Sequence, residues 1–321
     1  MPDNSFSPER VLPPSSTDMR DAYFDRLYDI MAADRNVILI TDDQGAFGVT
    51  RIQQELGDQC FNAGIAEQNI ISVAAGMALG GKRPYVYGIS TFMTMRCFEQ
   101  INVDLCCMDL PVSILASGPG FTYSSDGPTH HSNWDLGILR ILPGISLYSP
   151  SDATMTSKLA EASYENVGPS YIRIEKGVLP AIYETNDDAS KGFETLRSGE
   201  NIAIVSTGFM VHRALQVADA LAESHIEAGV IDLYRVKPID IDALLDALSN
   251  AERLVTIEEQ SKIGGIGTLI AELLADTGQS IPLKRIALPD RHFYDYGSRA
   301  WLHARNGLDE SGLMEAIRGW L

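Results

Sequence analysis

Short apolar runs alternate with segments of helical length along most of this chain, and this alternation limits the possible fold more than any other feature of the sequence. The segment Glu67–Leu79 shows the helical period, with Ile70 and Ala74 on one face at 3.6 residues per turn. Strands that alternate with helices form a largely parallel sheet with helices on both faces. The strands expected in the first part of the chain are Val37–Thr41, Cys60–Ile65, Pro84–Ile89, Val112–Ala116, Ile145–Tyr148 and Tyr171–Ile174.

The alternation pauses over Tyr183–Glu200, where Asn, Asp, Ser and Lys replace the apolar residues, and we interpret this stretch as a linker. A second, shorter alternation follows, in which the Gly-Gly-Ile-Gly run at 264–267 indicates a tight turn that leads into a helix. Its expected strands are Ile202–Ser206, Val230–Leu233, Leu254–Ile257 and Ile286–Ala287. The sequence therefore predicts a polar tail at residues 1–18, an α/β domain at 19–185, a linker at 186–200 and a smaller α/β domain at 201–321.

Composition excludes several classes of partner. The 321 residues are 45% hydrophobic, enough for two cores, and a net charge of −18 argues against nucleic acid or an anionic membrane. No apolar run reaches the roughly 18 residues of a membrane span, and the polar segment Met1–Thr17 is unlike a secretion signal, so we expect a cytoplasmic protein. Neither a CxxC pair nor a disulfide framework is formed by the cysteines, which are Cys60, Cys97, Cys106 and Cys107.

Glu67 is the first candidate functional group. It follows the apolar run Phe61–Ile65 and begins a helix whose other residues are mostly apolar or small. A carboxylate in this place either interacts with the helix macrodipole or performs chemistry. Position alone favours the structural interpretation.

Residues 126–131, which read Asp-Gly-Pro-Thr-His-His, form the second candidate. They lie in a Gly-, Ser- and Pro-rich loop after the strand Val112–Ala116, and open α/β sheets bind ligands beyond the carboxyl ends of their strands. Acid–base catalysis and a polar turn are equally open here. A metal site is disfavoured, because adjacent histidines rarely point the same way and no third ligand is near.

A third candidate is the stripe Phe92, Met95 and Phe98, which are spaced three apart and therefore share one side at the start of a helix. Such a stripe is usually plain core. It also suits a flat heteroaromatic ligand, because phenylalanine stacks and methionine sulfur is polarizable.

Together these signals resemble the pyrimidine-binding domain of transketolases, in order and in spacing. The residues that carry the resemblance are Met19–Tyr23, Thr41–Asp43, Gly64–Asn69, Ser90–Phe92 and Asp126–His130. The second domain resembles the C-terminal domain of the same enzymes through Ser206–Gly208, Val230–Pro238, Glu258–Gln260 and Gly264–Gly267. The resemblance covers the chain from about Arg20 onward, and the Asp-Gly-Pro-Thr-His run is what separates transketolases from other thiamine enzymes.

For the cofactor, thiamine diphosphate, the resemblance implies a catalytic role for Glu67. A glutamate at this position hydrogen-bonds a ring nitrogen of the aminopyrimidine and promotes the imino tautomer, which removes the proton from the thiazolium carbon. Phe92, Met95 and Phe98 would form the wall on which the pyrimidine stacks, although transketolases usually have an aromatic residue where Met95 stands. Asp42 matches a family position that contacts the cofactor.

For the sugar, the resemblance assigns Asp126 to hydroxyl binding and His130 to hydroxyl binding and catalytic proton transfer during carbon–carbon bond cleavage and formation. His131 has no counterpart, and we interpret it as structural.

Phosphate recognition is where the sequence departs from the family. Arg20 is present, but the second basic position is Lys176, a point charge instead of a bidentate fork, and Gly118 stands near the place of a histidine that usually contacts the donor phosphate. We therefore expect a sugar that is unphosphorylated or carries a different anionic or bulky group.

The family binds the diphosphate through Mg²⁺ held by a Gly-Asp-Gly run and a later Asn, and this sequence contains no Gly-Asp-Gly. The resemblance thus implies a split transketolase, in which this chain is the C-terminal section and holds no metal itself. An N-terminal-section partner subunit would carry the Mg²⁺ site, in an α2β2 assembly. The expected reaction is transfer of a two-carbon ketol unit from a ketose donor to an aldose acceptor.

Three alternatives stay open at this point. The beta subunit of a 2-oxo-acid dehydrogenase component has the same two domains, but lacks the Asp-Gly-Pro-Thr-His run. A deoxyxylulose-phosphate-synthase-like acyloin synthase is normally one long chain. A catalytically silent regulatory partner would have no chemical need for Glu67 and His130.

Overall fold

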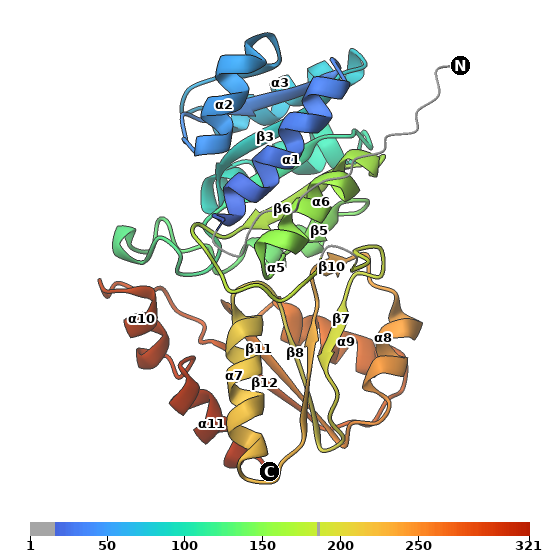
Figure 1. Cartoon of the computed structure of the whole chain (residues 1–321), viewed down its shortest axis with the longest axis vertical. Helices are drawn as coiled ribbons and strands as arrows, with labels where there is room; N and C mark the ends of the chain where they lie inside the picture. The colour runs from blue at the N-terminus through green and yellow to red at the C-terminus, as the bar shows by residue number, and fades with distance from the viewer. Residues whose placement is uncertain (1–16, 185–186) are drawn as a thin grey trace.

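The computed structural model describes residues 17–184 and 187–321, which form two α/β domains stacked along the long axis of the molecule (Figure 1). Residues 1–16 of the predicted tail, and the predicted boundary at 185–186, lie outside the described residues. The N-terminal half of the chain forms the upper domain in Figure 1 and the C-terminal half the lower one.

The sheet of the first domain has the strand order β10-β5-β6-β4-β3-β1-β2. Pairings among β1 to β6 are all parallel, as the alternation of strands and helices predicts. The strands from this domain are β1 (Val37–Thr41), β2 (Cys60–Asn62), β3 (Arg83–Ile89), β4 (Ser113–Ser117), β5 (Ser146–Tyr148) and β6 (Ser170–Ile174).

Helices cover both faces of this sheet, and the apolar run of β1 shows why. Ile38 and Ile40 pack into one core cluster with helix α3, whereas Val37 and Leu39 pack into another with α1. The helices of the domain are α1 (Met19–Ala33), α2 (Phe47–Glu55), α3 (Glu67–Leu79), α4 (Phe98–Gln100), α5 (Asp135–Arg140) and α6 (Ala153–Glu165). The predicted helix Glu67–Leu79 is confirmed at both ends.

The second domain has a five-stranded sheet of order β12-β11-β8-β9-β7. Its strands are β7 (Glu194–Arg197), β8 (Ile202–Ser206), β9 (Ala228–Asp232), β11 (Arg253–Ser261) and β12 (Leu283–Leu288). Its helices are α7 (Met210–Ala222), α8 (Ile241–Leu248), α9 (Ile266–Asp276), α10 (Arg299–Arg305) and α11 (Glu310–Arg318). Two α/β domains are thus confirmed.

The stretch predicted as a linker, residues 186–200, is not all linker, because it contains β7. This strand pairs antiparallel with β9 at the edge of the second sheet, and all four of its residues are half-buried. An edge strand with one solvent-facing side does not need an apolar run, so the residues Glu-Thr-Leu-Arg carry no strand signal.

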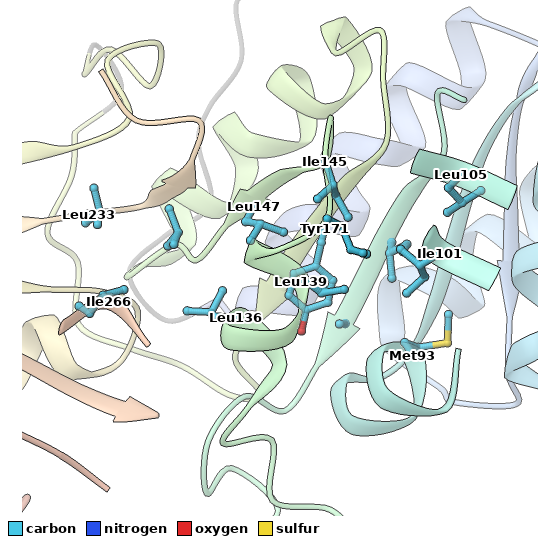
Figure 2. Packing of buried hydrophobic residues seen from close by; sticks show 14 of the residues in the cluster. Met93, Ile101, Leu105, Leu136, Leu139, Ile145, Leu147, Tyr171, Leu233 and Ile266 are labelled. Atoms are coloured by element: carbon cyan, nitrogen blue, oxygen red, sulfur yellow. The ribbon is translucent and has the colours of Figure 1, made fainter. Parts of the chain in front are cut away.

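A strand from the second half of the chain completes the first sheet. β10 (Arg235–Lys237) pairs antiparallel with β5, and the ammonium of Lys237 donates a 2.9 Å hydrogen bond to the carbonyl of Arg140. One apolar cluster runs on from the first sheet into the second domain. Figure 2 shows it passing from Leu105 and Tyr171 through Leu136 to Leu233 and Ile266. The two domains are therefore joined by shared core as well as by the chain.

No helix in the described part of the chain has both the length and the apolar composition needed to cross a membrane.

Candidate active site

The residues singled out from the sequence converge on the carboxyl ends of neighbouring parallel strands. Asp42 follows β1, Ser90 follows β3, and Lys176 follows β6 within two residues. The loop from Gly118 to Trp134 leaves the carboxyl end of β4, which lies between β6 and β3. This edge is where open α/β sheets bind ligands, because strand ends and helix N-termini meet there.

Glu67 is the first residue of α3 and is only 2% exposed. One of its carboxylate oxygens accepts a 2.7 Å hydrogen bond from Nη1 of Arg96, whose side chain is 44% exposed. Residue 66 makes no side-chain cap at this helix end, so the carboxylate of Glu67 faces the same positive end of the helix dipole. The Glu67 carboxylate is thus buried, while the side chain of Arg96, which binds it, is partly exposed to solvent.

The guanidinium of Arg96 also lies over the ring of Phe92, with 4.4 Å between its central carbon and the ring centroid. A planar, nitrogen-bearing group therefore stacks on Phe92 and hydrogen-bonds Glu67 at the same time. These are the two contacts that an aminopyrimidine ring needs, so the side chains present fit the pyrimidine of thiamine diphosphate. Arg96 was missed by the sequence reasoning, and its place four residues after Phe92 on a helix was the available signal.

Asp42 lies 6% exposed beside this pair. Burial, and secondarily the charge of Glu67, raise the pKa of Asp42 to about 6, while a 3.1 Å hydrogen bond from the backbone of Gln44 opposes the shift. Gly88 on β3 makes room for the Asp42 carboxylate, since a Cβ at residue 88 would lie 2.3 Å from Oδ2. Asp42 is therefore packed against the site, and its pKa lies above that of a solvent-exposed aspartate.

His130 stands across from Phe92, with 5.0 Å between the ring centroids in an edge-to-face arrangement. Nδ1 of His130 lies 3.0 Å from the hydroxyl of Thr129, and the ring of Tyr123 is 6.1 Å away. Because Nδ1 is held by Thr129, Nε2 of the imidazole is the nitrogen left to exchange a proton with a ligand. Arg96 thus links Glu67 to Phe92, and His130 packs against the same ring.

Asp126 is exposed and closes a short 3-10 turn, Ser124–Asp126, in the same loop. His131, by contrast, is fully buried and packs its ring edge-to-face on Phe121 at 4.9 Å. Burial lowers the pKa of His131, while the nearby carbonyl of Ser124 opposes the shift. The placement agrees with the structural role expected for His131.

The two basic residues expected to bind substrate lie in neighbouring segments. The backbone of Met19 donates to the carbonyl of Gly177 at 3.0 Å, and that of Gly177 donates to the Asp18 carboxylate at 2.9 Å, so the start of α1 is joined to the end of β6. Nε and Nη2 of Arg20 donate hydrogen bonds of 3.1 and 3.0 Å to the two carboxylate oxygens of Asp18. Lys176 is exposed.

Tyr123 fills the space beside Gly118, where a Cβ would meet its ring at 2.0 Å. Its hydroxyl lies 2.8 Å from the hydroxyl of Ser117 and accepts a 2.6 Å hydrogen bond from Nε2 of Gln44. The ammonium of Lys176 lies 5.3 Å from the centroid of the Tyr123 ring. The wall of the site at the end of β4 is therefore built from hydroxyl and amide groups.

The expected wall of Phe92, Met95 and Phe98 is not a single face. Phe92–Arg96 forms a π-helical turn, in which residues three apart no longer share one side as they do in an α-helix. Phe92 faces His130, Met95 is 42% exposed, and Phe98 packs against the core of the first sheet. Spacing alone could not show this, because the prediction assumed α-helical geometry.

Among residues 17–184 and 187–321, no group of three or more His, Cys, Asp or Glu side chains is arranged to hold a metal ion.

Two successive α/β domains, with a buried glutamate and an aromatic ring both contacted by Arg96 in the first, agree with the resemblance to enzymes that bind the pyrimidine of a thiamine cofactor. Profiles of two domain families match the chain: the transketolase pyrimidine-binding domain over residues 15–181 and the transketolase C-terminal domain over residues 192–313. This chain belongs to the transketolase family, whose enzymes depend on thiamine diphosphate.

Individual relatives agree with this assignment. The chain is 33% identical over 302 residues to one subunit of the apulose-4-phosphate transketolase of Phocaeicola vulgatus, covering 92% of this chain and 94% of the relative. It is also 33% identical over 313 residues to 1-deoxy-D-xylulose-5-phosphate synthase 1 of Geobacter sulfurreducens, but spans only 49% of that protein. A solved structure described as a split gene transketolase, inactive beta4 tetramer, superposes with a TM-score of 0.84 at 29% identity, covering 95% of this chain and 98% of that one.

Proposed function

We propose that this chain is the pyrimidine-binding subunit of a split, thiamine-diphosphate-dependent transketolase. The observation that carries the proposal is the buried carboxylate of Glu67, which accepts a hydrogen bond from Arg96 where that guanidinium lies over the ring of Phe92, with His130 packed edge-to-face against the same ring. The Phocaeicola vulgatus relative is itself named as a transketolase subunit and is matched over nearly its whole length, which supports a separate partner subunit. That partner would hold Mg²⁺ and the diphosphate through Gly-Asp-Gly, in an α2β2 assembly.

Each side chain then has a chemical task. Glu67 holds a proton at its carboxylate against a pyrimidine nitrogen, and Phe92 fixes the plane of the ring. His130 moves a proton at the sugar through Nε2, while Asp126 accepts hydrogen bonds from sugar hydroxyls. When bound, thiamine diphosphate supplies the carbanion chemistry that no side chain of this chain provides.

An exposed apolar rim supports a partner chain next to Glu67. Phe61 and Ile65, 40% and 76% exposed, lead into α3, while Phe47 is 87% exposed at the start of α2. Met95 adds a fourth exposed apolar side chain, one residue before Arg96. Large apolar side chains exposed beside a buried carboxylate are expected where another surface completes the site.

We further propose that the sugar differs from the ordinary sugar phosphates. Nε and Nη2 of Arg20 are bound by Asp18, whereas Lys176 is a cation of this wall that makes no ion pair in the described structure. Tyr123 and Gln44 offer neutral hydrogen bonds in the same place. The Phocaeicola vulgatus relative is named for a non-standard sugar, apulose 4-phosphate, which does carry a phosphate.

Purification of the complex with its partner, followed by replacement of Glu67→Gln, tests the enzyme proposal. Turnover should fall by about a hundredfold or more, the usual contribution of acid–base catalysis. Glu99→Gln, at an exposed residue of α4, is the matched control and should leave the rate unchanged. Equal rates for Glu67→Gln and the wild type would refute the proposal.

A substrate screen tests the proposal that the sugar differs from the ordinary sugar phosphates. Free ketoses, phosphorylated ketoses and pyruvate should be offered as donors to the same complex. If ordinary pentose and hexose phosphates are the best donors, the proposed sugar is wrong, and if pyruvate is the best donor, the chain serves an acyloin synthase.

A further inference from the structure

We propose that the second domain positions the loop that carries the substrate-binding side chains, and that Arg299 is the positioning residue that fixes this loop. The loop comprises residues 118–134, between β4 and α5, and is called the substrate loop below. Figure 1 shows it in green at the junction of the two domains, above α10. Its name rests on the function proposed for Asp126 and His130.

Arg299, the first residue of α10, joins the strand ends of the two sheets. Its Nη1 and Nη2 donate to the two oxygens of Glu175 at 2.8 and 2.9 Å, just after β6 of the first domain. Its Nε donates at 3.0 Å to Glu259, on β11 of the second domain, and its Nη2 donates to the other oxygen of Glu259. The guanidinium also stacks on the ring of Phe209 at 4.0 Å. One planar cation therefore serves two carboxylates from different domains.

These charges are removed from solvent, with side-chain exposures of 18% for Arg299, 4% for Glu175 and 5% for Glu259. Burial opposes ionisation of Glu259, yet Arg299 and His303 hold its pKa well below the ordinary value. Removal of one partner from such a group leaves the others charged and buried, which is costly.

The first half of the substrate loop rests on the two carboxylates. Gly120, at φ +58, lies so close to Glu259 that a Cβ would be 2.1 Å from Oε2. The hydroxyl of Thr122 donates to Oε2 of Glu175 at 2.8 Å. Because Arg299 fixes both carboxylates, it also fixes the two places where this part of the loop rests.

Between these residues, Phe121 leaves its own domain and enters the core of the second. It is fully buried in the cluster formed by β8, β11 and α7, and its ring packs edge-to-face on Phe293 at 5.1 Å. The loop is therefore anchored in the second domain by apolar burial as well as by charge.

The last residues of the loop are tied to β11, on which Glu259 lies. Nε2 of Gln260 donates to the carbonyl of Ser132 at 2.9 Å, and the backbone of Ser261 donates to that of Asn133 at 2.8 Å. Gly120 and Ser132 also form an antiparallel bridge across the base of the loop. Both ends of the loop are thus held by the second domain, and the residues between them carry Tyr123, Asp126 and His130.

Hydrogen exchange of the purified full-length chain tests this without any activity assay. In Arg299→Gln, peptides covering 118–134 should exchange at least about tenfold faster, the change expected for loss of a charge-assisted hydrogen bond, while peptides of α3 keep their wild-type rates. Arg305→Gln, on the same helix but with a side chain 54% exposed, is the matched control and should change the exchange rate of neither the loop peptides nor the α3 peptides. Arg299→Lys, which keeps the charge but loses the double fork, should give a smaller acceleration confined to the loop.

Unchanged exchange in the loop, or an equal acceleration in α3 and the loop, overturns the proposal, because the first shows no anchoring and the second shows only general destabilisation. If Arg299→Gln does not fold, Arg299→Lys is judged by the same two readings.

The effect of Arg299 on function is measured as KM and cofactor affinity in the assembled enzyme. Arg299→Lys should raise KM for the sugar several-fold, with a much smaller change in thiamine diphosphate affinity, since Glu67 lies on α3, which packs against the first sheet. A change in cofactor affinity equal to that in KM would overturn the assignment. A wild-type complex with no transferase activity would defeat the proposed function but leave the exchange result to decide the anchoring.

Discussion

Replacement of Asp42→Asn tests the electrostatics of the candidate site in the chain alone. Asp42 is 6% exposed and close enough to Glu67 for the two carboxylates to repel each other. Burial, then this repulsion, raise the pKa of Asp42 from 3.8 to about 6. Asparagine has the same size and keeps an oxygen that can accept the hydrogen bond from the backbone of Gln44. The substitution therefore removes mainly the charge.

The pKa shift of Asp42 sets the size and the sign of its effect on the free energy of unfolding. The folded chain holds the Asp42 proton to higher pH than the unfolded chain does, so this group lowers the free energy of unfolding as pH rises from about 4 to about 6. A shift of about 2 units, at about 1.4 kcal/mol per unit, amounts to about 3 kcal/mol. Asp42→Asn should match the wild type near pH 4 and be more stable by about 3 kcal/mol above pH 7, where the loss is complete.

Urea unfolding of the purified chain at a series of pH values measures this difference, and taking the difference between two proteins cancels the other titrating groups. Asp58→Asn is the control, because the Asp58 side chain is 91% exposed. A stability difference that is the same at acidic and neutral pH, or a variant less stable than the wild type above pH 7, would refute the reasoning.

Three further predictions concern the assembled enzyme. Arg96→Met should tighten thiamine diphosphate binding by up to about fivefold, because a partly exposed ion pair that competes for Glu67 is worth about 1 kcal/mol or less, and weaker binding in a cofactor titration would show that Arg96 helps to hold the cofactor. Lys176→Met should raise KM for an anionic sugar about tenfold while leaving KM for a neutral sugar unchanged, and an equal rise for both in steady-state kinetics would assign Lys176 to structure. Ile65→Asp should leave the melting temperature of the free chain within a few degrees of the wild type but abolish co-purification of the partner, since Ile65 is 76% exposed, and an intact complex would place the partner elsewhere.

Those parts of the fold that are buried on both sides could be predicted from the sequence. A strand such as β1, with five buried residues, must be apolar throughout, and a helix such as α3 must show a 3.6-residue period against the sheet. Glu67 and His130 became candidates because one begins a mostly apolar helix and the other lies in a loop after a strand, and the resemblance to transketolases supplied their expected roles. What they contact stays invisible in one sequence, because the partners come from other elements.

The parts that could not be predicted lack such a pattern. β7 and β10 are short edge strands, with four half-buried residues in β7 and one buried residue between two half-buried ones in β10, so neither contains an apolar run. The π-helical turn at Phe92–Arg96 changes which residues share a side, and π-helices have no sequence period that separates them from α-helices over five residues. Arg299 lies in a segment of ordinary polar composition, 124 residues from Glu175, and only the fold brings them together.

The candidate site has two parts, one on the helices of the first sheet and one on the substrate loop, which is tied to the second domain. The second domain therefore has a structural role at the site. Glu67 is the first residue of α3, whose buried residues pack against the first sheet. The substrate loop is too long and too polar to fix itself, and it obtains rigidity by inserting Phe121 into another core and by resting on carboxylates that Arg299 neutralises. Glu67 is thus placed beside exposed apolar side chains, while the loop that carries Asp126 and His130 is fixed by contacts with the second domain.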